Sequence, residues 1–280
     1  MIRPTPEQLK LLTRQERLWF ELADTVNRTP LTRRLTQVLQ RSLGRGWVRA
    51  STKNLSRIYD QHNLHALHPD RGVLFVCNHR SFFDFYVVAA NLYEQCPWLE
   101  RMFFPVRSNF FYDSALGTFV NVTMSMWAMF PPILRDSRRK EFNQYSVAFV
   151  EEALQHRGTV VGYHPEGTRS KSDDPYTLLP AQPGVGAIVH QARPIVVPVF
   201  ILGLINDLPR QIRSNFDGSG QPVNIVFGPA LDLSAYHTMP AESATYRAIS
   251  ETICAEITRL GALERAYRDR DGIPPFTPRS

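Results

Sequence analysis

The stretch VLFVCNHRSFFD, residues 73–84, decides the fold. Its first five residues form an uninterrupted apolar run, which is typical of a strand buried on both faces of a sheet. Ser81 and Asp84 then have the Ser-x-x-Asp spacing of a helix N-terminus. A buried strand that leads directly into a helix predicts an α/β protein, with His79 placed at the carboxyl end of the strand.

The same alternation continues along the chain. Strand-like apolar runs and helix-like segments follow one another, the strands at 102–106, 129–134, 159–163, 195–202 and 223–227 and the helices at 83–94, 108–127, 139–156, 184–191 and 241–268. This order predicts a mostly parallel or mixed central sheet covered by helices. Ligands of such folds bind at the carboxyl ends of the strands, so polar residues at those positions are the candidates for function.

The N-terminal segment, residues 1–57, is predicted to be a helical pair that precedes an α/β domain at 58–280. Helix starts are expected at Thr5-Pro6 and Thr29-Pro30. The second helix carries an apolar stripe of Leu31, Leu35, Val38, Leu39, Leu43 and Trp47, with Arg33, Arg34, Arg41 and Arg45 mostly off that stripe. Two interpretations remain open and are compatible: the pair docks on the main domain with a solvated basic face, or it faces an anionic membrane.

The positive charge of the chain is concentrated in this segment. The net charge is +6, and residues 1–57 hold twelve Arg or Lys against four Asp or Glu, which leaves −2 for residues 58–280. Such a patch attracts phosphate, in nucleic acid or in lipid headgroups. No nucleic-acid-reading motif is visible, and aromatic residues are not interleaved with the basic stretch as in a stacking platform, so a nucleic-acid partner is not expected.

The sequence gives weaker evidence on the cell compartment of the protein and on whether it spans a membrane. Three cysteines without paired spacing disfavour a disulfide framework or a zinc ribbon and favour a reducing cytoplasm. Residues 1–7 lack the apolar core of a signal peptide. The charge-free run 114–134 approaches the length of a membrane span, but polar residues dilute it and Pro131-Pro132 interrupt it, so a buried helix followed by a strand is expected.

His79 and Asp84 allow two interpretations. Asp84 can be a first-turn acid with Ser81 as the helix cap, and this explains the spacing without any catalytic role. Capping does not explain His79, however. A histidine at a strand end whose ring is oriented by a carboxylate one helical turn away can act as a general base.

A second polar cluster, YHPEGTRS at 163–170, follows the strand expected at 159–163. Glu166-Gly167 indicates a tight turn, and Arg169 offers a planar fork of donors for a phosphate or a carboxylate. A surface turn with a solvated arginine is the alternative interpretation.

Taken together, the two clusters resemble the blocks of the glycerolipid acyltransferases. NHRSFFD at 78–84 resembles their first block, N-H-x4-D, and HPEGTRS at 164–170 resembles their third block, usually F-P-E-G-T-R-S. PPILRDS at 131–137 resembles the second block and IVVPV at 195–199 the fourth. All four occur in the order of that family, which includes 1-acylglycerol-3-phosphate acyltransferases and glycerol-3-phosphate acyltransferases.

The resemblance implies an activity and roles for particular residues. His79 would deprotonate a hydroxyl of 1-acylglycerol 3-phosphate and Asp84 would hold His79, so that the hydroxyl attacks an acyl-CoA or acyl-carrier-protein thioester directly and yields phosphatidic acid. No metal and no further cofactor is implied, and the enzyme would lie on the inner face of the cell membrane. Phosphate binding would fall to Arg169, Arg135 and Arg107, while Glu166, Gly167 and Thr168 would position the glycerol and shape the turn.

Several alternatives remain open at this stage. The acceptor could be glycerol 3-phosphate or another lysolipid, and an inactive lipid-binding scaffold is a different class that the intact His79 and Asp84 disfavour. His164, where the family usually has Phe, is expected to be an exposed spacer. The aromatic residues Phe103, Phe104, Phe110, Phe111, Tyr112, Phe119, Trp127 and Phe130 are expected in the core, or else around an acyl-chain slot. His62, His65 and His68 are expected to be solvated rather than metal ligands.

Overall fold

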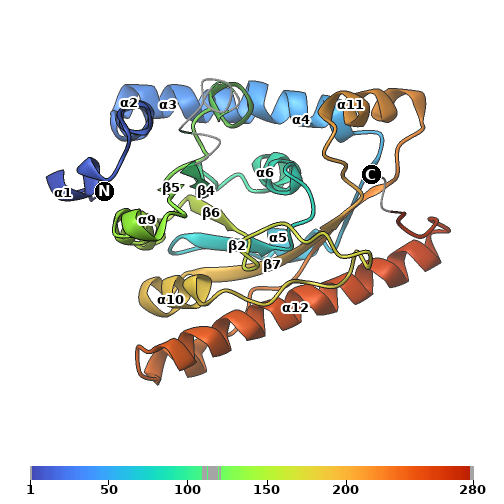
Figure 1. Ribbon diagram of the computed structural model, residues 1–280. Helices are drawn as coiled ribbons and strands as arrows, with labels where there is room; N and C mark the ends of the chain where they lie inside the picture. Colours follow the sequence, from blue (N-terminus) through green and yellow to red (C-terminus); the bar gives the residue numbers. More distant parts are fainter. Residues whose placement is uncertain (1, 109–111, 113–118, 120, 278–280) are drawn as a thin grey trace.

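The computed structural model describes residues 2–108, 112, 119 and 121–277, and its centre is a six-stranded mixed sheet (Figure 1). The strands lie in the order β1-β8-β7-β2-β6-β3, where every neighbouring pair is parallel except the antiparallel pair β7–β8. Their bounds are β1 Ser56–Tyr59, β2 Val73–Cys77, β3 Arg101–Phe103, β6 Thr159–Tyr163, β7 Ile195–Leu202 and β8 Val223–Phe227. Two short strands, β4 Val106–Arg107 and β5 Pro132–Ile133, form a separate parallel pair. The predicted α/β class is confirmed.

Helices cover both faces of this sheet. They are α1 Pro6–Lys10, α2 Arg14–Arg28, α3 Pro30–Leu39, α4 Arg45–Thr52, α5 His62–His65, α6 Asp84–Gln95, α9 Phe142–Ala153, α10 Pro183–Ala192, α11 Leu208–Asp217 and α12 Ser243–Arg270. Short π-helices lie at η1 Gln40–Gly44 and η2 Asn121–Ser125, and short 3₁₀-helices at η3 Ser137–Arg139 and η4 Ser234–Thr238. In Figure 1, α6 lies against one face of the sheet with α3 and α4 above it, and α10 and α12 lie against the opposite face.

The core consists of two apolar clusters, one on each face. Alternate strand residues point to opposite sides, so that Leu74 and Val76 pack with α9, α10 and α12 while Val73, Phe75 and Cys77 pack with α4 and α6. All five residues of β2 are buried. This explains the uninterrupted apolar run, because a central parallel strand contacts helices on both sides.

The strands are predicted well where both of their faces are buried. The expected bounds of β2, β6, β7 and β8 match the structure. The run 102–106 is instead divided between β3 and β4, and only Pro132–Ile133 of the run 129–134 forms a strand. β1 was not predicted, since SRIY is half exposed and lacks the apolar signal. The expected domain boundary between residues 57 and 58 falls inside β1.

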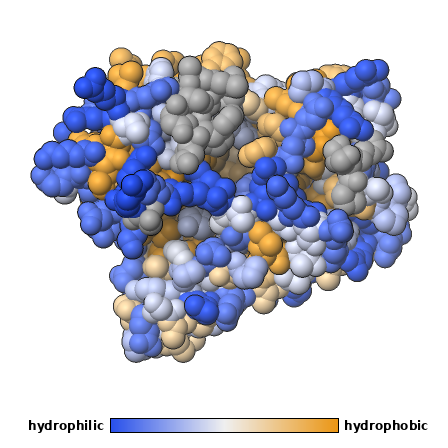
Figure 2. Space-filling view, viewed as in Figure 1, coloured by the Kyte–Doolittle hydropathy of each residue, from blue (hydrophilic) through white to orange (hydrophobic). Residues whose placement is uncertain are grey.

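α3 and η1 dock with the side opposite to the one expected for a packed helix. On α3 and η1 the polar residues Thr36 and Gln40 are buried, and the Gln40 side chain donates to the Met126 carbonyl oxygen at 3.0 Å. The apolar stripe points to solvent, with Leu31, Leu35, Val38 and Leu43 between 57% and 77% exposed. α3 and η1 are therefore docked on the main domain, and their apolar stripe as well as their basic residues reaches solvent. Figure 2 shows apolar residues along the upper rim of the molecule, above α2 and α3.

The aromatic residues between 103 and 130 belong mainly to the core. Phe103, Phe104, Tyr112, Trp127 and Phe130 are buried, whereas Phe119 is exposed. Phe110 and Phe111 lie outside the described residues, as does most of the helix expected at 108–127 and the first part of the charge-free run 114–134. Within the part of the chain that the structure describes, no helix combines the length and the apolar character needed to cross a membrane.

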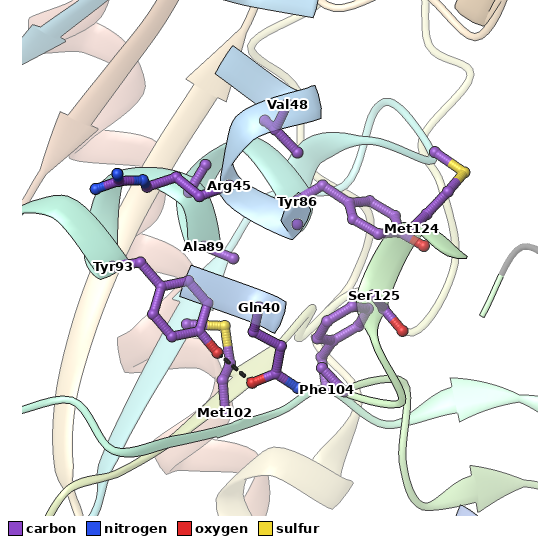
Figure 3. Close-up of a pocket in the computed structure, with 13 residues that line it drawn as sticks. Gln40, Arg45, Val48, Tyr86, Ala89, Tyr93, Met102, Phe104, Met124 and Ser125 are labelled. Atoms are coloured by element: carbon purple, nitrogen blue, oxygen red, sulfur yellow. Dashed lines mark hydrogen bonds between the residues drawn. The ribbon is translucent and has the colours of Figure 1, made fainter. Parts of the chain in front are cut away.

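A small cavity lies among some of these residues (Figure 3). It has a volume of about 30 Å³ and lies between α4, α6 and the segment that follows β3. Tyr86, Ala89, Met102 and Phe104 line it, and the Tyr93 hydroxyl closes one side by donating to Gln40 Oε1 at 2.6 Å. A cavity of this size has room for one or two water molecules and not for an acyl chain.

Candidate active site

The site begins where β2 ends, and Asn78 fixes this point. Its side-chain amide donates to the Ile201 carbonyl oxygen at 2.9 Å, and the Ile201 N–H donates to Asn78 Oδ1 at 2.8 Å. The buried Asn78 side chain thus continues the hydrogen-bond ladder between β2 and β7 by one more step. Because the chain leaves the sheet at a defined position, the next residue, His79, is held at the carboxyl edge.

His79 and Asp84 form the expected pair. His79 Nδ1 lies 3.2 Å from Asp84 Oδ2, and the side chains of the two residues are 20% and 2% exposed respectively. The same carboxylate oxygen accepts the N–H groups of Arg80 and Ser81, each at 2.7 Å. With Nδ1 directed at the carboxylate, Nε2 is the nitrogen available to take a proton from a substrate.

The helix start differs in detail from the expected capping box. α6 begins at Asp84, and the Ser81 hydroxyl accepts from the Phe83 N–H at 3.1 Å rather than from the backbone of Asp84. Asp84 does accept the Ser81 N–H, so one half of the reciprocal pattern is present. One oxygen of Asp84 therefore accepts backbone N–H groups just before α6 and also contacts the His79 ring.

Burial and nearby charge displace both pKa values from their ordinary range. Burial raises the pKa of Asp84 to about 6, although the N–H groups that it accepts counteract part of this effect. Burial and the positive charges of Arg169 and Arg107 lower the pKa of His79 to about 3. At neutral pH the pair is therefore a neutral imidazole beside a carboxylate, which is the protonation state that a general base requires.

Glu166 joins the two motifs through hydrogen bonds to the backbone. Its Oε1 accepts the His79 N–H and its Oε2 accepts the Leu179 N–H, both at 2.7 Å, and the residue is 2% exposed. Both carboxylate oxygens are thus used by the backbone. The carboxylate thus fixes the position of His79, and the expected contact of Glu166 with a glycerol stays a prediction.

Gly167 forms the expected tight turn. Its N–H donates to the His164 carbonyl oxygen at 3.0 Å and its φ is +66°, a conformation that residues with a Cβ rarely adopt. Gly167 is exposed and Thr168 is half buried, so the turn faces outward beside the base.

The three arginines also gather beside this turn. Arg107 donates to the Gly167 carbonyl oxygen at 2.6 Å, and burial together with the charges of Arg135 and Arg169 lowers the pKa of Arg107. Arg169 lies over the Phe82 ring at 3.6 Å from its centroid, and Arg135 is exposed. Among the described residues, none of the three forms an ion pair with a carboxylate. The cluster is therefore a positively charged region without its counter-charge, next to His79.

Arg80 has a role that the sequence analysis missed. Its guanidinium donates to the Ser170 hydroxyl at 3.1 Å and to the Ser172 carbonyl oxygen at 2.7 Å, while the Ser170 N–H donates to the His79 carbonyl oxygen at 2.8 Å. These bonds tie the loop after the second cluster to the first motif. No spacing in the sequence signals this contact, because its partners are mostly backbone atoms more than 85 residues away.

His164 is the second residue that was misjudged. The expectation of an exposed spacer is wrong, because its ring stacks on the His79 ring with centroids 3.9 Å apart and planes 12° from parallel. The pairing of β2 with β6 explains this contact, since His164 follows β6 just as His79 follows β2.

A metal site is not apparent in the described residues. They contain no group of three or more His, Cys, Asp or Glu side chains placed to hold an ion. His62, His65 and His68 are exposed, and His65 contacts the Gln95 side chain at 3.0 Å.

The fold and this site define a class of protein: an α/β protein with a histidine–carboxylate pair and a cluster of arginines at the carboxyl edge of its sheet. A model of the acyltransferase family matches residues 57–202, more than half of the chain. The chain therefore belongs to the acyltransferase family, which confirms the resemblance found in the sequence.

No curated protein matches this chain. Among solved structures, the chain is similar to the 1-acyl-sn-glycerophosphate (LPA) acyltransferase PlsC from Thermotoga maritima, with 15% identity, a TM-score of 0.45, and coverage of 90% of this chain and 97% of that chain.

Asp84→Asn is expected to stabilise the fold at neutral pH. The pKa of Asp84 lies near 6 in the folded protein against an ordinary 3.8, so the folded state binds the extra proton between these values and stability falls as the pH rises through this window. Removal of the buried charge should raise the free energy of unfolding at pH 7.5 by roughly 1–3 kcal/mol. Urea denaturation at pH 7.5 and pH 4.5 measures this, with a smaller gain expected at pH 4.5.

The matched control is Asp173→Asn, which removes an exposed carboxylate. Its stability should change by less than about 0.5 kcal/mol at either pH. A lower stability of Asp84→Asn at pH 7.5 would show that the hydrogen bonds accepted by the carboxylate outweigh the cost of burying its charge.

Proposed function

We propose that the protein transfers a fatty acyl group from a thioester, acyl-CoA or acyl carrier protein, to the hydroxyl of 1-acylglycerol 3-phosphate and so forms phosphatidic acid. Membership of the acyltransferase family supports the transfer of an acyl group. The choice of a phosphate-bearing acceptor rests on one observation: Arg107, Arg135 and Arg169 gather beside the base without a carboxylate partner in the described residues. Guanidinium groups bind phosphate oxygens through paired, charge-assisted hydrogen bonds.

In the proposed reaction His79 is the general base, and Asp84 orients the His79 ring. The acceptor hydroxyl attacks the thioester carbonyl carbon, a C–O bond forms, and His79 Nε2 takes the hydroxyl proton. The C–S bond then breaks and the leaving thiolate takes the proton from His79. Asp84, 3.2 Å from Nδ1, stabilises the imidazolium that exists between the two proton transfers. The serine and cysteine side chains have no part in these steps.

The arginine cluster has a second proposed effect, on the basicity of His79. In the free site the charges of Arg169 and Arg107 contribute to the low pKa of His79. A phosphate dianion bound by these guanidinium groups would offset their positive potential and raise that pKa toward its ordinary value. His79 would thus become a stronger base when the acceptor is bound, because the ligand supplies the missing counter-charge.

Two other acceptors fit the same site less specifically. Glycerol 3-phosphate carries the same phosphate, and other lysolipids carry it within a larger headgroup. An inactive lipid-binding scaffold remains the alternative of a different class. Measured turnover with any of these acceptors would exclude the scaffold.

His79→Ala should abolish most of the turnover. Loss of a general base lowers kcat by roughly 10²–10⁴-fold. The measurement is the release of free thiol from palmitoyl-CoA with 1-acylglycerol 3-phosphate, and product formation is followed by mass spectrometry. His62→Ala, which removes an exposed histidine, is the control and should leave kcat unchanged. Equal kcat for His79→Ala and wild type would exclude His79 as the base.

Arg169→Gln should mainly weaken binding of a phosphate-bearing acceptor. Loss of a charge-assisted hydrogen bond corresponds to a rise of roughly 10- to 100-fold in KM, with a smaller change in kcat if the contact is equal in ground and transition states. The exposed Arg259, which pairs with Glu256, provides the control Arg259→Gln. If KM for 1-acylglycerol 3-phosphate and for an uncharged monoacylglycerol rise equally, the phosphate role of Arg169 is wrong.

We also propose that the protein binds an anionic membrane surface through α2, α3 and η1. Exposed apolar residues on these helices lie among arginines, an arrangement typical of helices that rest in the headgroup region. α11 carries the same pattern: its polar residues Gln211 and Asn215 are buried while Ile212 and Phe216 are exposed. It packs against α4, where the Asn215 side chain donates to the Ala50 carbonyl oxygen at 2.8 Å.

The triple change Leu31→Gln, Leu35→Gln and Val38→Gln should reduce binding to vesicles that contain anionic lipid. All three side chains are exposed, so the fold should persist while apolar area for the bilayer is lost, and vesicle-bound protein should fall by roughly tenfold or more. Co-sedimentation measures the bound fraction. Met239→Gln, an exposed apolar residue after η4, is the control. Unchanged co-sedimentation of the triple variant would remove this face from the proposal.

A further inference from the structure

The histidine that follows β6 lies directly against the proposed base. The rings of His164 and His79 are almost parallel, with centroids 3.9 Å apart and an interplanar angle of 12°. The Phe85 ring meets His164 edge-on, with centroids 6.4 Å apart and planes at 86°. His164 is thus enclosed between the base and the first turn of α6, and its ring has a single well-defined orientation.

Hydrogen bonds fix this orientation and the position of one proton. His164 Nδ1 lies 3.0 Å from the Cys77 carbonyl oxygen and 3.1 Å from the Asn78 carbonyl oxygen. Carbonyl oxygens only accept, so Nδ1 must carry the hydrogen and donate it. The ring is therefore attached to the end of β2, the strand that also carries His79. The distance between the two rings is set by the sheet and not by a loose loop.

His79 needs a restraint of this kind. Its contact with Asp84 is 3.2 Å long and involves only one ring nitrogen, so it restricts the tilt of the ring weakly. A parallel ring at 3.9 Å restricts that tilt, because a rotation of His79 out of its plane would drive it into His164. Small errors in the placement of a reacting group lower the rate strongly.

We propose that His164 is a positioning residue for the base: its anchored ring holds the plane of His79 so that Nδ1 faces Asp84 and Nε2 faces the substrate, and its face supports the imidazolium formed during transfer. The inference rests on the proposed function, in which His79 takes the hydroxyl proton.

The charge state of His164 agrees with this role. Burial, and next to it the neighbouring His79, lower the pKa of His164 to about 3, so the ring is neutral at neutral pH. A neutral aromatic ring attracts a cation that lies over its face, whereas a second cation at this distance would repel it. His79 can therefore accept a proton beside His164 only because His164 does not carry one.

Three variants separate the effect of the His164 ring from the effect of its Nδ1 hydrogen bond to the end of β2. His164→Phe keeps an aromatic ring and loses the donor, His164→Asn keeps an amide donor near the Nδ1 position and loses the ring, and His164→Ala loses both. If the ring positions the base, His164→Phe should retain kcat within about fivefold, whereas His164→Asn and His164→Ala should lose roughly 10- to 100-fold. KM for 1-acylglycerol 3-phosphate should change less than about twofold, because His164 does not contact the arginines. His62→Ala serves again as the control.

The second readout is ¹⁵N NMR of labelled histidines, which does not depend on activity. In wild type and in His164→Phe, His79 should show a single neutral tautomer with the hydrogen on Nδ1. In His164→Ala and His164→Asn it should show a mixture of tautomers, and its pKa should move toward the ordinary value.

Two results would overturn the inference. One is wild-type kcat together with an unchanged His79 tautomer in His164→Ala. The other is a His164→Asn enzyme at least as active as His164→Phe, which would assign the effect to the anchor alone. Should His164→Ala fail to fold, the pair His164→Phe and His164→Asn still decides between these results. If wild type transfers no acyl group to any acceptor, the proposed function fails, and the NMR comparison still shows whether His164 sets the state of His79.

Discussion

The site depends on one buried carboxylate, that of Glu166. The parallel pairing of β2 with β6 and β7 brings two polar segments from distant parts of the chain to the same edge of the sheet. Pairing alone leaves the loops beyond the strands undefined, and Glu166 defines them by accepting the N–H groups of His79 and Leu179. Burial raises the pKa of Glu166, and the two donated N–H groups counteract that rise. Because the bonds go to backbone atoms, the position of the base is independent of its own side-chain identity. The hydrogen bonds of Glu166, which set the position of His79, can therefore be considered separately from the chemistry of the His79 side chain.

Charge in the site is distributed so that a ligand completes it. Asp84 and Glu166 are buried acids that accept backbone N–H groups beside His79, and Arg107, Arg135 and Arg169 have no carboxylate partner in the described residues. The charges of Arg169 and Arg107 lower the pKa of His79, so the free site carries positive potential at the imidazole. An anionic acceptor would relieve this positive potential directly. In the proposed function this arrangement would favour ligands with a phosphate over neutral ones of the same shape, since a neutral ligand would leave the guanidinium groups unpaired.

The sequence predicted best those elements whose residue pattern has a single physical explanation. β2, β6, β7 and β8 were found with their bounds because strands buried on both faces need continuous apolar residues. His79, Asp84 and Arg169 were singled out because they follow such strands. The structure places His79 against Asp84, and the roles of all three residues stay predictions. β1 was missed since an edge strand such as SRIY carries little apolar signal. The outward stripe on α3 was misjudged because periodicity reveals an amphipathic helix without revealing which side is docked. The backbone hydrogen bonds of Glu166 and the stacking of His164 were not predicted, because their partners are backbone atoms and a ring that the topology, not the local sequence, brings near.

α3 and η1 dock through polar residues and leave their apolar stripe exposed, and the packing of the neighbouring helices connects this proposed lipid face with the site. α4 packs against α6, the helix whose first residue is Asp84, and α11 packs against α4. The loop before α11 reaches the segment between His79 and α6, because the Asn206 side chain accepts the Phe82 N–H at 2.9 Å, and the Phe82 ring lies under Arg169. Apolar residues that face outward on α3 and α11 are thus connected to the arginine cluster through a few packed elements. A lysolipid must expose its headgroup to the base while its chain leaves an apolar phase. In the proposed arrangement α4 connects the outward-facing helices with α6, so that a lysolipid would present its headgroup to His79 without being extracted whole into water.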